Sequence, residues 1–258
     1  MDFMVLIGVG ISIAAILVGC PDIFKDLMNY LQPNAMVLVL VGTIGSTFIS
    51  SSKKSIVSIG KVFKHILFRK KKLQPLEAVD ALVDIAKIAQ TASKQSLADL
   101  GGGKGDGFLG RALGMVADGL EKDFVNQTLI TDISEISRRH ELQITAVKTM
   151  GSYAPMYGML GTVVGVIMVL KNVSDIDVIV EGMALALLTT LYGLFLSSVF
   201  FIPLSNKLKG MNEDEVLTKE IIRVGILMIM DKEIPLKVEK YLLAYIEQGQ
   251  KNDRNKEK

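Results

Sequence analysis

The sequence predicts an all-α, polytopic membrane protein with four transmembrane helices and a cytoplasmic helical domain. Of the 258 residues, 50% are hydrophobic, and the mean hydropathy is +0.40. Four apolar runs carry no charged residue, and each is about as long as a helix that crosses the hydrocarbon core of a bilayer. Lysine and arginine gather after the second and the fourth run, which indicates that these flanks lie on the same side of the membrane.

The first two crossings are expected near the N-terminus. The run at 3–20 (FMVLIGVGISIAAILVGC) lacks the basic leader and the small-residue cleavage site of a signal peptide, so we expect a helix that is retained. A short connection that ends at Pro33 leads to the second run, 34–52. In that run Gly42 and Gly45 are typical of a surface at which helices pack closely in lipid.

The basic residues indicate the orientation. The connections 21–33 and 171–181 carry one lysine each, and Lys207 and Lys209 follow the fourth run. A larger group follows the second run: Lys53, Lys54, Lys61, Lys64, Arg69, Lys70, Lys71 and Lys72. Because basic flanks stay in the cytoplasm, we expect both termini there. The same group is typical of contact with anionic membrane lipid, which we favour over nucleic-acid binding because the formal net charge is only +2.

The segment 53–148 is predicted to be the cytoplasmic helical domain. Apolar residues recur at helical spacing over 76–100, and the GGGKGDG sequence at 101–107 then forms a flexible linker. It resembles a phosphate loop only superficially, because no strand precedes it and no Lys-Ser/Thr pair follows. A short amphipathic helix is expected over 108–120, and a longer one over 123–147 runs into the third crossing.

The third and fourth runs, 149–170 and 182–206, are predicted to form a transmembrane hairpin around the short connection KNVSDIDVIVE. Small residues recur in both runs at spacings of three and four, which places them on one helical face. They are Pro155, Gly158, Thr162 and Gly165 in the first and Ala186, Thr190, Gly193 and Ser197 in the second. We interpret the glycines and alanines as packing positions, since such faces let helix backbones approach closely in lipid.

The threonines and prolines of this hairpin have a second interpretation. The hydroxyls of Thr162 and Thr190 lie at membrane depth, where each either bonds to a carbonyl of its own helix or lines a polar path. Pro155 and Pro203 lie inside the runs and leave backbone carbonyls without a donor, which favours a hinge or an ion ligand.

After the hairpin we expect a cytoplasmic tail with helices near 215–230 and 236–246 and a disordered polar end. The domain limits are therefore predicted as transmembrane helices 1 and 2 at 1–52, the cytoplasmic helical domain at 53–148, transmembrane helices 3 and 4 at 149–206, and the C-terminal tail at 207–258.

The sequence offers little that suggests an enzyme. It has one cysteine, Cys20, and two histidines, His65 and His140, and it lacks nucleophile-elbow, zinc-protease and redox motifs. We therefore expect no catalytic residue, no bound cofactor and no metal. The apolar runs also hold no Asp, Glu, His, Lys or Arg near their centres, so the chain either moves no ions or uses a carboxylate from a partner.

The runs YAPMYGMLGTVVGVIMVL and ALALLTTLYGLFLSSVFFIPLSNKL closely resemble the MotA/PomA subunits of bacterial flagellar stators, in the MotA/TolQ/ExbB proton channel superfamily. The shared pattern is Pro-x-x-Gly-x-x-Gly-Thr-x-x-Gly, then Thr-x-Tyr-Gly and a closing Pro-x-x-x-Lys-Leu. The resemblance extends to FLGRALGMVADGL and to GILMIMDKEIPLKVEKYL, so nearly the whole chain is covered. The more distant ExbB/TolQ proteins have three crossings, whereas this chain is predicted to have four.

This resemblance implies a ring subunit of the bacterial inner membrane, with five such chains around two copies of a MotB/PomB partner. The transmembrane Asp of the partner accepts the ion, and proton or sodium flow turns the flagellar rotor. The family's ion-path residues match Thr162, Thr190 and Tyr192, and its conformational prolines match Pro155 and Pro203. The residues do not indicate which of the two ions is used.

The usual rotor-facing Arg and Glu of the family are replaced here by Gln90 and Ala98. The charged residues Lys94, Asp99 and Arg111 are then candidates for contact with a FliG-like rotor switch protein, or they are solvated helix charges. The alternative functions are an ExbB/TolQ-like energiser of an envelope process, and a passive membrane scaffold.

Overall fold

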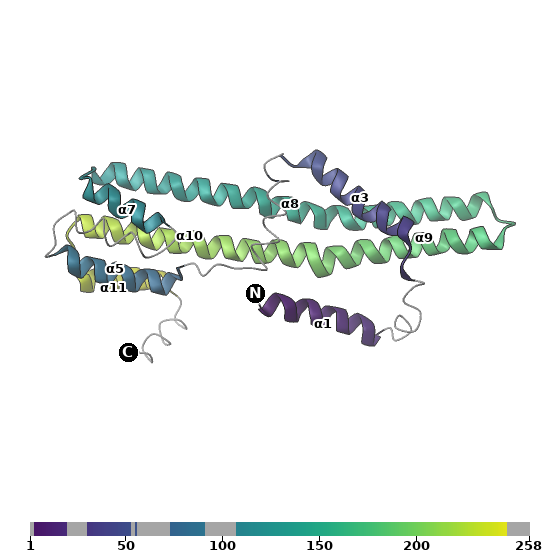
Figure 1. The fold of residues 1–258 in the computed structure, drawn as a ribbon, viewed down its shortest axis with the longest axis horizontal. Helices are drawn as coiled ribbons and strands as arrows, with labels where there is room; N and C mark the ends of the chain where they lie inside the picture. The colour runs from purple at the N-terminus through teal and green to yellow at the C-terminus, as the bar shows by residue number, and fades with distance from the viewer. Residues whose placement is uncertain (1–2, 20–29, 53–54, 56–72, 91–106, 247–258) are drawn as a thin grey trace. The chain divides into compact units, whose positions relative to one another are not determined.

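The computed structural model describes residues 3–19, 30–52, 55, 73–90 and 107–246, and the regular structure within them is helical (Figure 1). The chain forms two compact units, each described here by itself. The hairpin unit comprises Met1–Arg69 and Glu141–Lys209, and the amphipathic unit comprises Lys70–His140 and Gly210–Lys258. The expected all-α class is confirmed.

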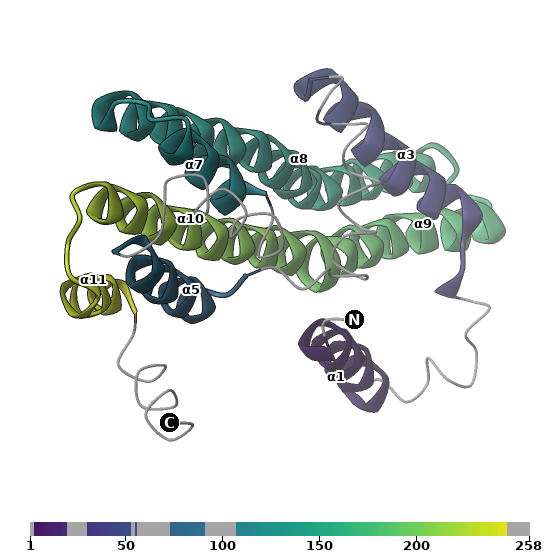
Figure 2. The same ribbon diagram turned by 60° about the vertical axis from the view of Figure 1, so that its left-hand side comes forward.

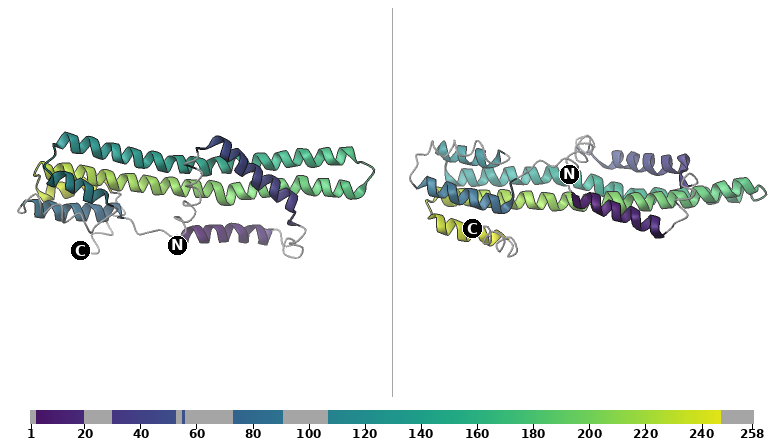
Figure 3. Two further views of the ribbon diagram at one scale, coloured as in Figure 1. Left: turned by 45° about the horizontal axis from the view of Figure 1, so that its top comes forward. Right: turned by 60° about the horizontal axis from the view of Figure 1, so that its bottom comes forward.

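The hairpin unit contains α1 (Phe3–Gly19), α3 (Pro33–Ser50), the second part of α8 (Lys122–Lys171), α9 (Ile176–Phe195) and a short π-helix, η2 (Leu196–Phe201). The helix α10 (Ile202–Met230) follows η2 directly. Figure 3 shows α9 lying alongside α8, with α3 crossing this pair obliquely. The carboxylate of Asp175 accepts the N–H groups of Asp177 and Val178, so α9 begins before the uncharged run does.

Three helices of the described chain are long and apolar enough to cross a membrane: α3, α8 and the continuous helix from Ile176 to Met230. The helix α1 is also apolar, and its 17 residues lie at the lower limit for a crossing. Large apolar side chains such as Val163, Leu170 and Leu187 stand exposed on the hairpin. This pattern agrees with the four expected crossings, because lipid rather than water surrounds such surfaces.

The amphipathic unit contains α5 (Pro75–Ala89), α7 (Phe108–Ala117), the first part of α8, most of α10, α11 (Pro235–Leu242) and the 3₁₀ turn η3 (Leu243–Tyr245). Figure 2 shows α5 beside α11. Its core is apolar, and its largest fully buried side chains include Leu82, Phe108, Leu113, Leu129, Ile226 and Leu242. A capping box between Gln74 and Glu77 closes the start of α5.

The expected elements agree with most of the described helices. The predicted run of 123–147 into the third crossing is confirmed, because α8 continues without a break through that point. Of the helix expected over 76–100, residues 75–89 are helical and 91–106 lie outside the described residues. The compact units change at 69/70, 140/141 and 209/210, and α8 and α10 are continuous across the last two points. The predicted domain limits remain a prediction.

Candidate functional site

The hairpin is held by a line of small residues along which the backbones of α8 and α9 touch. A Cβ added to Gly193 would lie 2.5 Å from the carbonyl oxygen of Ala154, and one added to Gly158 would lie 3.0 Å from that of Thr189. A Cβ on Gly165 would overlap the carbonyl oxygen of Gly182. We call this line the hairpin seam, formed by Ala154, Gly158, Gly161, Gly165, Gly182, Ala186, Thr189 and Gly193. As predicted, the glycines serve close helix packing.

Thr189 lies at the centre of the hairpin seam and was missed by the sequence analysis. Its side chain is fully buried. The hydroxyl lies 2.8 Å from Leu185 O, 3.0 Å from Ala186 O and 3.2 Å from Gly158 O. With one proton to donate, it is surrounded by acceptors on both helices. The sequence could have indicated that Thr189 faces α8, because positions 182, 186, 189 and 193 follow one another at helical spacing.

Thr190 lies at the edge of the hairpin seam and is half-buried. Its hydroxyl is 3.3 Å from Ala186 O and 3.4 Å from Gly158 O, both long for a hydroxyl donor. Thr162 lies beside the seam residue Gly161, and its hydroxyl donates to Met159 O at 2.6 Å. Each threonine therefore bonds to a carbonyl of its own helix, as in the first of the two interpretations, and Thr190 also reaches Gly158 O on α8. The polar path remains a prediction.

Two tyrosines attach α3 to the hairpin. The hydroxyl of Tyr192 donates to Tyr30 O and accepts the N–H of Gln32 at 3.1 Å, directly before α3 begins. On α8, the hydroxyl of Tyr157 lies 2.7 Å from Ser46 Oγ, and its ring fills the space that a Cβ on Gly42 would need. Tyr192 thus anchors α3, and its place on the ion path remains a prediction.

Both predicted prolines lie in helical backbone of the hairpin unit. Pro155 lies inside α8, one residue beyond the seam residue Ala154. Pro203 is exposed and is the second residue of α10, directly after η2. A π-helix here was not predicted.

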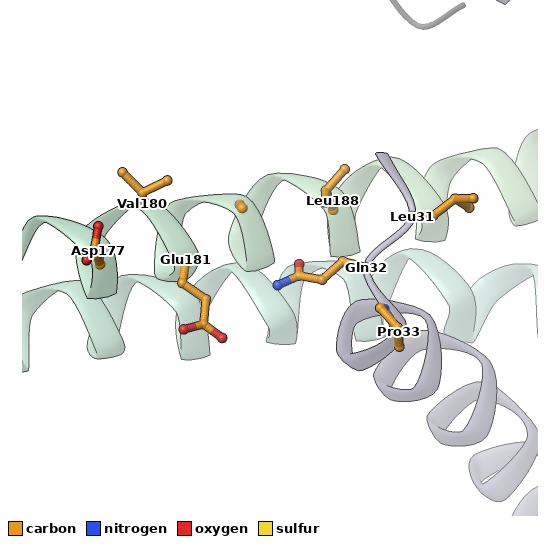
Figure 4. A pocket seen from close by; sticks show the side chains of 8 residues that line it. Leu31, Gln32, Pro33, Asp177, Val180, Glu181 and Leu188 are labelled. Atoms are coloured by element: carbon orange, nitrogen blue, oxygen red, sulfur yellow. The ribbon is translucent and has the colours of Figure 1, made fainter. Parts of the chain in front are cut away.

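An open recess lies beside the start of α3 (Figure 4), lined by Leu31, Gln32, Pro33, Asp177, Val180, Glu181, Ala184 and Leu188. Asp177 and Glu181 are exposed on successive turns of α9. Their charge favours the approach of cations. No group of three or more His, Cys, Asp or Glu side chains that could hold a metal ion occurs among the described residues.

Of the charged candidates for rotor contact, Arg111 lies in the amphipathic unit, whereas Lys94 and Asp99 fall outside the described residues. Cys20 and His65, which are not rotor candidates, also fall outside them. The guanidinium of Arg111 lies 2.6 Å from the carboxylate of Asp132, and both side chains are partly exposed. An exposed pair of this kind contributes about 0–1 kcal/mol.

A partly buried polar group joins α8 and α10 in the same unit. His140 Nδ1 lies 3.0 Å from Asn212 Oδ1, and Asn212 donates to Ser137 Oγ. Lys219 is buried beside the carboxylate of Glu215. Further along α10, the guanidinium of Arg223 donates a hydrogen bond to the carboxylate of Glu220, which raises the pKa of Arg223 and keeps it charged. The hydrogen bonds of Asn212 with His140 and Ser137 thus link α10 to α8.

Known proteins similar to the chain agree with this architecture. A model of the MotA/TolQ/ExbB proton channel family matches residues 104–221. Motility protein A of Treponema phagedenis is 31% identical over 193 residues, covering 75% of this chain and 73% of the relative. The chain belongs to the motility protein A family. PomA of Vibrio alginolyticus is 29% identical over 97% of this chain and 98% of its own length.

Solved structures extend the likeness over the whole motility protein A fold. The flagellar MotAB stator complex from Bacillus subtilis matches with a TM-score of 0.84 and 27% identity, covering 96% of this chain and 97% of that chain. The MotAB structure from C. jejuni matches with a TM-score of 0.87 at 22% identity, which shows the fold. As a motility protein A, the chain is a flagellar stator subunit and a membrane protein of a channel family.

The hairpin seam predicts a strong effect of one added methyl group. Gly165→Ala would place its Cβ against the carbonyl oxygen of Gly182, so α8 and α9 must separate. We expect a loss of the folded hairpin, seen as a lower melting temperature in detergent and less protein in the membrane fraction. Gly45→Ala on α3 is the control, because nothing lies within 4 Å of its added Cβ. Equal melting temperatures for the two variants would contradict the seam.

The Arg111–Asp132 pair predicts how a rotor contact can be separated from a folding effect. Arg111→Glu breaks the pair, and the further change Asp132→Arg restores it with the charges exchanged. If Arg111 contacts the rotor, we expect slower swimming in both variants at unchanged membrane level. Recovery of swimming in the exchanged pair would instead assign Arg111 to this internal contact, and normal swimming in both would leave it a solvated charge.

Proposed function

We propose that the chain is the ring-forming subunit of a flagellar stator that, with a MotB/PomB-like partner, makes an ion channel and converts proton or sodium flow into torque. One observation carries this proposal. The two helices of the hairpin seam have no Asp, Glu, His, Lys or Arg over 149–170 and 182–206, so a partner would supply the ion-binding carboxylate. The likeness to the MotAB stator complex supports such a partner.

The proposed assembly is a homopentamer around two partner chains, in the bacterial inner membrane and with both termini in the cytoplasm. The basic residues after the second and fourth crossings support this orientation. The exposed apolar side chains of α3, α8 and α9 support further burial against other chains or lipid. The amphipathic unit would then face a FliG-like rotor protein, and the transported proton or sodium ion would be the only small ligand.

The proposed ion path runs along Thr162, Thr190 and Tyr192. Of these hydroxyls, that of Thr190 is held least tightly, because both of its bonds are longer than 3.2 Å. It can turn from Gly158 O to a partner carboxylate or to an ion without displacing either helix. Thr162 and Tyr192 have stronger bonds to backbone groups, so we give them the role of lining the path.

The alternative is an ExbB/TolQ-like energiser, because the matched family model covers those proteins too. It would use the same ion-driven mechanism with another load. The match to MotAB over 96% of the chain favours the stator. The two functions differ in the partner, which has a peptidoglycan-binding domain in the first and a TonB- or TolR-like part in the second.

The proposal is tested by supplying the chain and its one-helix partner to a bacterium that lacks stators. We expect tethered cells to rotate, and native mass spectrometry of the purified complex to show five copies of this chain. Rotation should depend on the proton or the sodium gradient, which identifies the ion. Paralysed cells with both proteins present in the membrane would refute the stator function, and a stable monomer or dimer would refute the ring.

Two adjacent threonines separate ion conduction from packing. Thr190→Val removes the weakly held hydroxyl with little change of shape, so we expect normal assembly and slow or absent rotation, since one interhelical bond in a membrane is worth about 0.6–2 kcal/mol. Thr189→Val places a methyl group among three carbonyl oxygens and should reduce assembly itself. Thr162→Val should act as Thr190→Val does.

Tethered-cell speed and immunoblots of the membrane fraction measure both effects. Full speed in the Thr190→Val and Thr162→Val variants would return these threonines to a packing role.

A further inference from the structure

In the interior of α8, a proline leaves one carbonyl without its helical donor. Pro155 has no N–H, so the carbonyl of Gly151, four residues earlier, receives no bond from that position. The hydroxyl of Ser197, on the opposite helix of the hairpin, donates to this oxygen at 2.6 Å. Both residues are buried. Ser197 thus supplies to α8 the hydrogen bond that Pro155 removes.

Ser197 also takes part in the irregular backbone before Pro203. Its own carbonyl accepts the N–H of Ile202, five residues later, which is the bond of a π-helix. Pro203 follows at once and has no N–H to offer to the carbonyl of Val199. The wider turn of η2 therefore ends where the second proline interrupts the regular pattern, and Ser197 bonds across that turn.

The two proline regions also touch directly. A Cβ on Gly151 would lie 3.0 Å from Ile202 Cγ1 and 3.3 Å from Phe201 Cβ. Phe201 packs in a small apolar cluster with Val147, Met150 and Ala154. The backbone at Gly151 and the end of η2 leave too little space for an added Cβ, so we expect a movement of one to displace the other.

We propose that Ser197 is a positioning residue that couples the two prolines, through its hydroxyl to the Pro155 region and through its carbonyl to the Pro203 region. The inference rests on the proposed ion-driven function of the hairpin. If the helix bends at Pro155 when the partner takes up an ion, Gly151 O moves and Ser197 moves with it. The π-turn carries this displacement to Pro203 and into α10.

The neighbouring serine provides a matched control. Ser198 is exposed, and its hydroxyl donates at 2.6 Å to Leu194 O of its own helix. The bond lengths are equal, but only Ser197 bonds to the other helix. Ser197→Ala and Ser198→Ala therefore remove the same group, one from the proposed coupling and one from an ordinary helix surface.

Rotation of tethered cells with the partner present tests the role in coupling. We expect Ser197→Ala to rotate more slowly than wild type at equal membrane level, and Ser198→Ala to rotate normally. Wild-type speed of Ser197→Ala, or an equal loss in both variants, would overturn the proposal. A wild-type complex that fails to rotate would refute the proposed function. The inference is then tested by the melting temperatures described next.

Melting of the purified complex tests the hydrogen bond independently of rotation. Ser197→Ala leaves Gly151 O without its donor, and we expect a melting temperature lower by about 2–4 °C. Pro155→Ala returns an N–H four residues from Gly151, so Ser197→Ala should have no further effect in that background. If the Ser197→Ala complex does not assemble, the double variant Pro155→Ala/Ser197→Ala should still assemble. Additive losses, or a double variant that also fails, would overturn the proposal.

Discussion

The close approach of two backbones in the hairpin seam is the contact on which the rest of the hairpin unit depends. In lipid, apolar side chains gain little by packing on one another, so helices associate through tight contact and hydrogen bonds. Glycine at 158, 165, 182 and 193 permits this contact, and each of these positions faces the backbone of the other helix. The same contact brings hydroxyls within reach of carbonyls across the hairpin, which larger residues would prevent.

The amphipathic unit follows a different rule, since water is its solvent. Its stability comes from removing apolar side chains such as Phe108, Leu82 and Ile226 from water. It also tolerates buried charge, because Lys219 and Glu215 form a pair within one helix turn. The helix α8 shows both rules along one element, with charged residues and polar bonds in its first part and only uncharged residues from 149 to 170.

Much of this architecture follows from the sequence, because an uncharged run of membrane length has few alternatives to a helix. The packing face was predicted less well. Spacings of three and four describe neighbouring faces almost equally, so the predicted faces contained Thr162 and Thr190, whereas the seam passes through Gly161 and Thr189. The π-turn at Leu196–Phe201 could not be predicted, since it depends on where Ser197 meets the other helix. Only Pro203 indicated irregular backbone there.

The runs 149–170 and 182–206 carry no charged side chain, so they can respond to a charged partner only through their dipoles. In the described hairpin, the hydroxyls that donate from one helix to the other do so at two carbonyls of α8, those of Gly151 and Gly158. Both lie close to Pro155, one a turn before it and one a turn after. Gly158 O is shared by two threonine hydroxyls, one of them loosely held, while Gly151 O has one short bond from Ser197. In the ion-driven function proposed above, the weak bond on one side of the proline would yield to an ion, and the strong bond on the other side would transmit the movement.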